Sequence, residues 1–125
     1  MSNIKESLAS ALETDGAVGV ALGDWNTGFS LGQITADSAK FPETTLEKAI
    51  ALNSEVLKAK NKAREGLGIT EEIEDILITL ENQYHLLRTA KTVPGVFFYM
   101  VMNRDKANLG LARIKLREVE KTLKV

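Results

Sequence analysis

The chain has 125 residues and a mass of 13.7 kDa, the size of one globular domain. Hydrophobic residues make up 44% of it and charged residues 26%, which excludes the polar composition typical of disordered proteins. The 16 basic and 17 acidic residues leave a net charge of −1, so no overall field attracts nucleic acid. We therefore expect a single domain over residues 1–125 that does not bind nucleic acid.

The composition also excludes several kinds of chemistry. The absence of cysteine excludes disulfides, a thiolate nucleophile and cysteine-bound zinc or iron–sulfur groups. The single histidine, His85, cannot by itself complete a multi-histidine metal site or a Ser-His-Asp triad, and the chain contains no P-loop motif. The apolar run over residues 93–102 is about half as long as a membrane span. We expect a cytoplasmic protein without membrane insertion, with no catalytic residue, no cofactor and no metal.

The first third of the chain predicts a helix followed by a hairpin. Apolar residues recur at helical spacing between residues 3 and 14, where Asn3 and Glu6 have the positions of a capping box. The unbroken apolar run of residues 17–23 is typical of a strand in the middle of a sheet. Apolar and small residues alternate over residues 29–32, which predicts a second strand nearer the edge.

The middle of the chain predicts the longest helix. Thr44 and Glu47 match a capping box, and Gly66 and Gly68 provide its end, so that about twenty residues form roughly 30 Å of helix. One stripe of this helix is wide enough to contact both the sheet and a second helix. Its members include Leu46, Ile50, Asn53, Leu57 and Lys60. A lone Asn53 in such a stripe can set the register of two paired helices.

Three strands are expected next, over residues 73–82, 84–91 and 96–102. The first alternates, with Ile76, Ile78 and Leu80 on one apolar face, and the last is a continuous apolar run that suits a central strand. Residues 66–86 also hold five carboxylates and no lysine or arginine, so symmetric pairing of the first of these strands could bring like charges together.

The C-terminal residues 107–125 predict an amphipathic helix. Asn103 or Asp105 could cap its first turn. Gly110 interrupts an otherwise good helical pattern, which we interpret as a position where the helix backbone approaches the sheet closely.

These elements predict an α/β sandwich of the α+β class. Two central strands require helices on both faces of the sheet. If the two are neighbours, the five-stranded antiparallel sheet has the order 2-1-5-4-3 and the third strand lies at an edge. Its apolar residues Ile76, Ile78 and Leu80 would then favour association with a second chain, because an uncovered apolar edge strand pairs readily.

The motifs together resemble a known family. Residues 15–22 with the following turn, the long middle helix and residues 104–113 (RDKANLGLAR) are similar to the Roadblock family of dynein-associated light chains, and the likeness extends over residues 14–123. The resemblance implies that the first and last helices cover one face of the sheet and the middle helix the other. It also implies a homodimer in which the middle helices pack together and the third strands pair into one ten-stranded sheet.

The resemblance also carries a functional expectation. The bacterial members of the family are the most similar to this sequence, and some of them partner small Ras-like GTPases as regulators of cell polarity or motility. We therefore expect a homodimeric adaptor or regulatory protein without catalytic activity, whose partner is a small Ras-like GTPase. Arg64, near a helix end, is a candidate for an arginine supplied to that GTPase.

Two alternatives remain open on the sequence. A profilin-like or sensor-like module would bind a small molecule between sheet and helix, although the bulky Phe97, Phe98 and Tyr99 favour a filled core there. An enzyme is less favoured, because no nucleophile has a base beside it in the sequence pattern and His85 suits a structural role better. Trp25 lies in the predicted hairpin turn. Two roles remain open for it: an exposed contact with a partner, or packing over the end of the sheet.

Overall fold

The computed structural model of the protein describes residues 2–125. Its elements are α1 (Ile4–Leu12), β1 (Ala17–Asp24), β2 (Phe29–Thr35), α2 (Glu43–Gly66), β3 (Asp75–Thr79), β4 (Gln83–Thr89), β5 (Val96–Asn103) and α3 (Leu109–Thr122). Within these residues the five strands form one antiparallel sheet in the order β2-β1-β5-β4-β3. The predicted fold class and strand order are confirmed.

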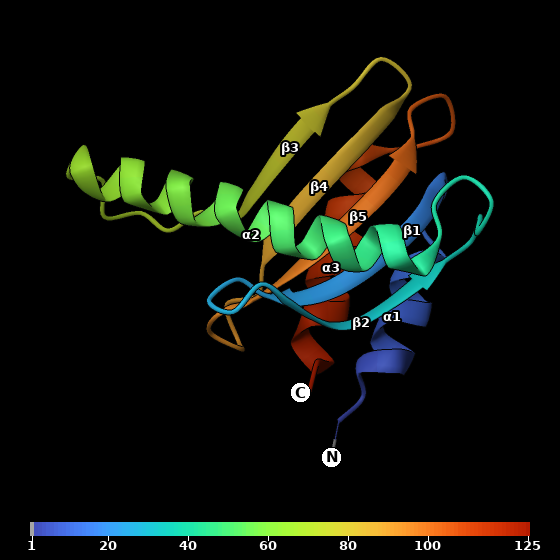
Figure 1. Ribbon diagram of the computed structural model, residues 1–125, viewed down its shortest axis with the longest axis horizontal. Coiled ribbons are helices and arrows are strands. Elements are labelled where there is room, and N and C mark those ends of the chain that lie inside the picture. Colours follow the sequence, from blue (N-terminus) through green and yellow to red (C-terminus); the bar gives the residue numbers. More distant parts are fainter. Residues whose placement is uncertain (1) are drawn as a thin grey trace.

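The helices cover both faces of the sheet. Figure 1 shows α2 crossing one face, while α1 and α3 lie together on the other and the two chain ends lie near each other. Asn3 ties these ends: its side chain donates to the Thr122 carbonyl and accepts from the Lys124 N–H, both at 2.6 Å. Asn3 is the residue before α1, but the capping-box prediction is wrong because its amide is used in this bridge instead.

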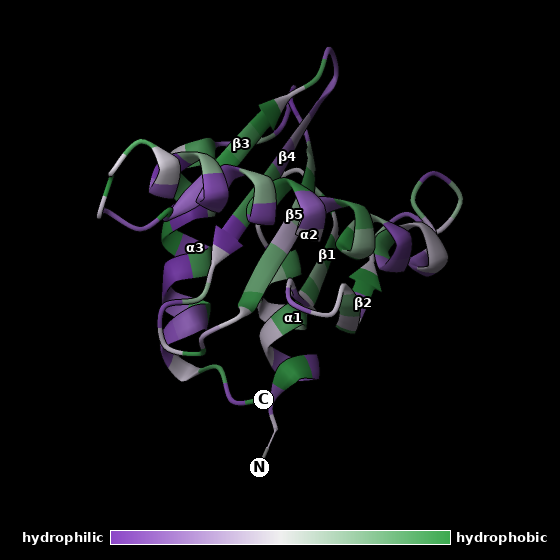
Figure 2. Cartoon of the chain, turned by 60° about the vertical axis from the view of Figure 1, so that its left-hand side comes forward, coloured by the Kyte–Doolittle hydropathy of each residue, from purple (hydrophilic) through white to green (hydrophobic). Residues whose placement is uncertain are grey.

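The sheet separates two apolar cores. Side chains of β1 and β5 alternate between them, which explains why both strands are apolar without interruption. Figure 2 shows hydrophobic residues concentrated in the sheet, while the helices alternate between hydrophilic and hydrophobic positions. Phe97 and Tyr99 fill the space under α2, and Phe98 fills the space under α1 and α3. All three are almost completely buried, so bulky side chains occupy the space between sheet and helices.

A glycine sets the distance between α2 and β1. A Cβ atom added to Gly23 would overlap the γ-methyl group of Ile50, which is itself fully buried. The helix therefore lies closer to the strand than a larger residue at position 23 would allow. Gly23 is therefore a packing position.

Two further cap predictions are wrong. Helix α2 starts at Glu43 after Pro42, and Glu47 accepts a hydrogen bond from the Gln33 side chain at 2.9 Å, so it does not complete a box with Thr44. Helix α3 starts after Asn108, whose side chain accepts from the Leu111 N–H at 3.1 Å. Asn103 and Asp105 do not cap this helix, because Asn103 still belongs to β5 and the turn that follows separates it from α3.

The interpretation of Gly110 as a close contact with the sheet is also wrong. The residue is exposed on the first turn of α3, and an added Cβ would meet only the Asn108 side chain at an ordinary 3.4 Å. The glycine pattern is misleading here because Gly110 lies on the solvent side of α3.

We predict that Gly110→Ala raises the free energy of unfolding by about 0.4–1 kcal/mol. Alanine restricts the unfolded chain and favours helix, and the folded structure has room for its methyl group. Urea unfolding followed by circular dichroism measures the change, with Gly23→Ala as the matched control that should lose stability. A loss of stability in Gly110→Ala would show that the backbone there is constrained after all.

Candidate interaction site

Helix α2 has one face that is entirely internal. Leu46, Ile50 and Leu57 are fully buried against the sheet of the same chain, in the core that also contains Phe97 and Tyr99. The sequence pattern places these three side chains at an interface. That assignment needs correction, because they hold α2 on its own sheet and have no surface left for a partner.

The opposite face of α2 carries a separate apolar stripe. We define the outer stripe as Leu52, Val56, Ala59 and Ala63, which recur every three to four residues and point away from the sheet. Leu52 is 63% exposed and Val56 is 42% exposed. The helical spacing of this stripe is present in the sequence, but the buried stripe contains larger residues and gives the stronger signal.

Asn53 and Lys60 lie beside the outer stripe. Asn53 is half-buried, and its amide donates to the Ala49 carbonyl of its own helix at 2.9 Å. This bond satisfies the amide within one chain, so setting the register of a helix pair is not needed to explain the residue. Lys60 is exposed next to the outer stripe.

The open edge of the sheet is β3. This strand pairs only with β4 within the described residues. Ile76 and Ile78 are half-buried and face the core under α2, while Leu80 follows the strand and is exposed. The predicted edge position and the shared face of Ile76 and Ile78 are confirmed, but the predicted strand is too long and Leu80 does not belong to it. The edge runs beside the overhanging end of α2 (Figure 1).

The acidic start of β3 is partly neutralised by its own chain. Asp75 accepts two hydrogen bonds from Arg113 of α3, at 2.9 and 3.2 Å, and Lys91 lies 3.3 Å from Glu74. The hydrogen bond to Asp75 raises the pKa of Arg113 above its ordinary value. These ion pairs reduce the like-charge repulsion that the sequence predicts for two paired β3 strands.

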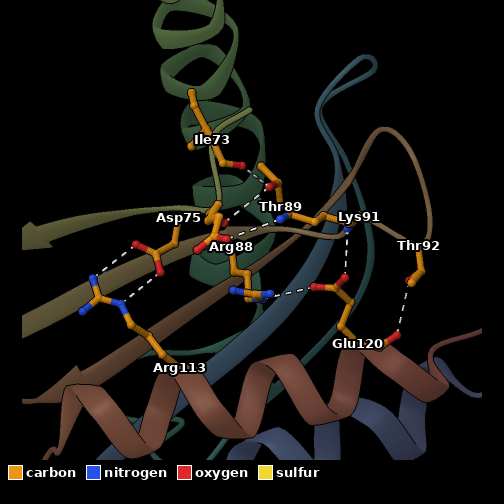
Figure 3. A network of polar contacts seen from close by, with 9 residues as sticks. Ile73, Asp75, Arg88, Thr89, Lys91, Thr92, Arg113 and Glu120 are labelled. Carbon is orange, nitrogen blue, oxygen red and sulfur yellow. Dashed lines mark hydrogen bonds and ion pairs between the residues drawn. The ribbon is translucent and has the colours of Figure 1, made fainter. Parts of the chain in front are cut away.

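A buried ion pair joins α3 to β4. Arg88 and Glu120 are each 5% exposed, and the Arg88 Nε atom donates to Glu120 at 3.1 Å. The second carboxylate oxygen accepts from the Lys91 N–H at 3.0 Å. Figure 3 shows Glu120 and Arg113 reaching from α3 to the strands, so that two charged contacts fix α3 against β3 and β4.

His85 occupies a structural position on β4, close to the edge strand. The Tyr99 hydroxyl donates to its Nδ1 atom, and its Nε2 atom donates to the Gln83 side chain, both at 3.0 Å. The ring also meets the edge of Phe41, with 6.2 Å between centroids. Burial lowers the pKa of His85 below 6.5, and both nitrogens are already used by the neutral ring.

We predict that the protein loses stability as the pH falls below 6.5. Because the pKa of His85 is lower in the folded protein, the unfolded chain takes up the proton first and is favoured. The stability that the neutral His85 ring contributes is complete above pH 6.5 and is lost as the pH falls through the lowered pKa. Urea midpoints between about pH 5.5 and 7.5 test this, with His85→Phe as the control that should flatten the slope. An equal slope in both proteins would contradict the assignment to His85.

A groove of about 590 Å³ opens beneath the C-terminal end of α2. Trp25 lines the groove and also packs on Phe97, with 6.4 Å between ring centroids. It therefore covers the core at the end of the sheet and also forms part of the groove surface. Lys58, Lys62 and Lys91 add positive charge. The groove is open to solvent between the end of α2 and the ends of β1 and β4, and the carboxylates of Glu65 and Glu72 also line it. It therefore does not match the enclosed apolar pocket that a sensor-like module needs.

Arg64 lies in the same groove but is held by its own helix end. Its Nε atom donates to the Asn61 side chain and its Nη1 atom to the Ile69 carbonyl, both at 3.1 Å. These bonds close the end of α2. They explain Arg64 without a role in a partner's chemistry.

No protein family and no curated protein matches the chain by sequence. Solved structures match it closely in shape. A Roadblock/LC7 domain from Streptomyces avermitilis superposes with a TM-score of 0.81 at 13% identity, over 97% of this chain and 94% of that one. The chain has the Roadblock/LC7 fold. The gliding protein MglB from Thermus thermophilus gives a TM-score of 0.79 at 20% identity, over 94% of this chain and 83% of that one.

A third structure shares the Roadblock/LC7 fold. MglB in a tetrameric arrangement has a TM-score of 0.81 and 21% identity, over 96% of this chain and 84% of that one. At these identities the likeness concerns the fold, and it confirms the sheet order and helix placement that the sequence predicts. Within residues 2–125, no helix of this Roadblock/LC7 fold is long and apolar enough to cross a membrane.

Proposed function

We propose that the chain is a bacterial member of the Roadblock family and acts as a homodimeric adaptor or regulator that catalyses no reaction. The observation that carries this proposal is the outer stripe of α2, which exposes Leu52 and Val56 beside an open β3 edge. Pairing two α2 helices and two β3 strands would cover both surfaces and extend the sheet to ten strands. The tetrameric arrangement of MglB is an example of self-association by a protein of this fold.

The position of α2 supports a joint interface of helix and strand. Helix α2 runs past β3 at the edge of the sheet (Figure 1). A second copy that pairs its β3 with this edge therefore meets the overhanging helix at the same time. One interface then includes the outer stripe, Lys60, Ile76, Ile78 and Leu80. The buried residues Leu46, Ile50 and Leu57 support this interface indirectly, because they hold α2 on its own sheet.

Charge supports the same arrangement. The overhanging part of α2 carries Lys58, Lys60 and Lys62, all exposed. The residues before β3 include the exposed carboxylates of Glu71 and Glu72. In the proposed dimer Lys60 of each helix end lies over the partner's sheet, where it offsets these carboxylates and lowers the repulsion between the two edges. Lys58 and Lys62 line the groove beside Trp25 instead.

The proposed partner of the dimer is a small Ras-like GTPase, as the family resemblance implies. An adaptor can regulate such a protein by holding its switch loops in one arrangement, which requires tighter binding to one nucleotide state than to the other. The groove beside Trp25 offers a half-exposed aromatic ring among lysine and glutamate side chains, a combination suited to contact with a charged surface of another protein.

Calorimetric titration tests the partner. A small Ras-like GTPase from the same organism is loaded with GDP or with a GTP analogue and titrated into the protein. We expect one nucleotide state to bind at least about tenfold more tightly and Trp25→Ala to weaken that binding. Gly110→Ala, on the opposite face, is the matched control. No binding in either state would remove the GTPase from the proposal.

A further inference from the structure

The face opposite α2 carries a second exposed apolar surface. Leu111 and Ile114 lie one turn apart on α3 and are 55% and 47% exposed. They point away from the buried side of the helix, which Ala112, Leu116 and Val119 hold against the sheet. The proposed dimer uses α2 and the β3 edge, so it would leave this face of both protomers open.

These two side chains belong to a groove of about 280 Å³ between α3 and the turn that joins α1 to β1. Glu13, Asp15 and Glu118 provide three carboxylates along it, against the single ammonium group of Lys115. Lys115 lies 3.6 Å from Glu13, whose side chain is largely exposed. The groove therefore combines an apolar floor with a negatively charged rim.

We propose that this groove docks a short amphipathic segment of another protein, in which apolar anchor residues are flanked by lysine or arginine. The floor offers apolar contact to one or two bulky side chains, and cations beside them can pair with the rim carboxylates. An acidic segment in the groove would be repelled by these three carboxylates. Within this chain, the basic C-terminal end of α2 is a segment of this kind. In the proposed dimer that end already belongs to the interface between the two copies.

The experiment measures fluorescence anisotropy with two labelled probe peptides. One is an amphipathic helix with leucines on one face and lysines on the other, and the second has glutamates in place of the lysines. We expect the lysine peptide to bind with micromolar affinity and the glutamate peptide not to bind. Leu111→Ser/Ile114→Ser should raise the dissociation constant at least about tenfold. Leu67→Ser/Ile69→Ser removes two other exposed apolar residues and should leave it unchanged.

The charged rim is tested separately. Glu13→Gln/Glu118→Gln should raise the dissociation constant about three- to tenfold at low salt and reduce its dependence on salt. Circular dichroism checks that each variant is folded. No binding of the lysine peptide, equal binding of both peptides, or equal affinity of the wild type and Leu111→Ser/Ile114→Ser would overturn the proposal. The result does not depend on dimerisation, because every residue of the groove comes from one chain.

Discussion

Replacing Glu120 with alanine is expected to lower the free energy of unfolding by about 3–5 kcal/mol. Glu120 and Arg88 are both buried, and the carboxylate accepts from Arg88 and from the Lys91 N–H. Removing it leaves a guanidinium group without a partner in an apolar environment, where an unpaired charge is strongly unfavourable. Urea unfolding followed by circular dichroism at about pH 7.5 measures the loss.

A double variant separates the unpaired charge from the loss of contacts. In Arg88→Met/Glu120→Leu both charges are gone, and we expect most of the stability to return, because apolar residues of similar volume often replace a buried ion pair without loss. If Glu120→Ala costs less than about 1 kcal/mol, water must reach the pair and the described burial is incorrect.

Leu57→Ala should have the second-largest effect, a loss of about 2–5 kcal/mol. Leu57 is fully buried between α2 and the sheet, so alanine leaves a cavity that the surrounding side chains fill only in part. Leu111→Ala is the matched control, because this leucine is also helical but is 55% exposed, and its change should stay within about 0.5 kcal/mol.

The same variant distinguishes the two assignments of Leu57. If the residue belonged to an interface, Leu57→Ala would weaken self-association and leave the unfolding of the single chain nearly unchanged. A loss of chain stability places it in the core. Unfolding of dilute samples and sedimentation of concentrated samples give the two readouts.

The order of the strands is predictable because it depends on a strong physical signal. A strand covered on both faces must be apolar along its buried length, and among the described strands only β1 and β5 meet this condition, up to their last residues Asp24 and Asn103. Placing these two side by side sends each hairpin outward and leaves β2 and β3 at the edges. The edge position of Ile76 and Ile78 follows directly from this arrangement.

The face of α2 that meets the sheet is harder to predict. Leu57 and Leu52 both belong to stripes with helical spacing, and spacing alone does not tell which stripe packs on the chain's own sheet. The contact between Gly23 and Ile50 decides it, and that contact joins residues far apart in the sequence. The interface prediction therefore includes Leu46, Ile50 and Leu57 from the inner face of α2, and an interface on the outer face stays a proposal.

The charged contacts of α3 have no local sequence signal. Arg88 and Glu120 are 32 positions apart, and Asp75 and Arg113 are 38 apart, so no motif connects them. Capping motifs, in contrast, are visible in the sequence, but the predictions made from them are wrong here. They are short patterns, and a tertiary partner can take over the side chain, as Gln33 does for Glu47.

The mass of the protein in solution tests most directly whether two copies associate through the outer stripe. Sedimentation equilibrium at micromolar concentration should give twice the chain mass of 13.7 kDa for the wild type. Leu52→Lys/Val56→Glu should give the mass of one chain with an unchanged circular dichroism spectrum, because it places charges on an exposed face and leaves the core intact. A wild type that stays at 13.7 kDa, or a double variant that remains a dimer, would contradict this interface.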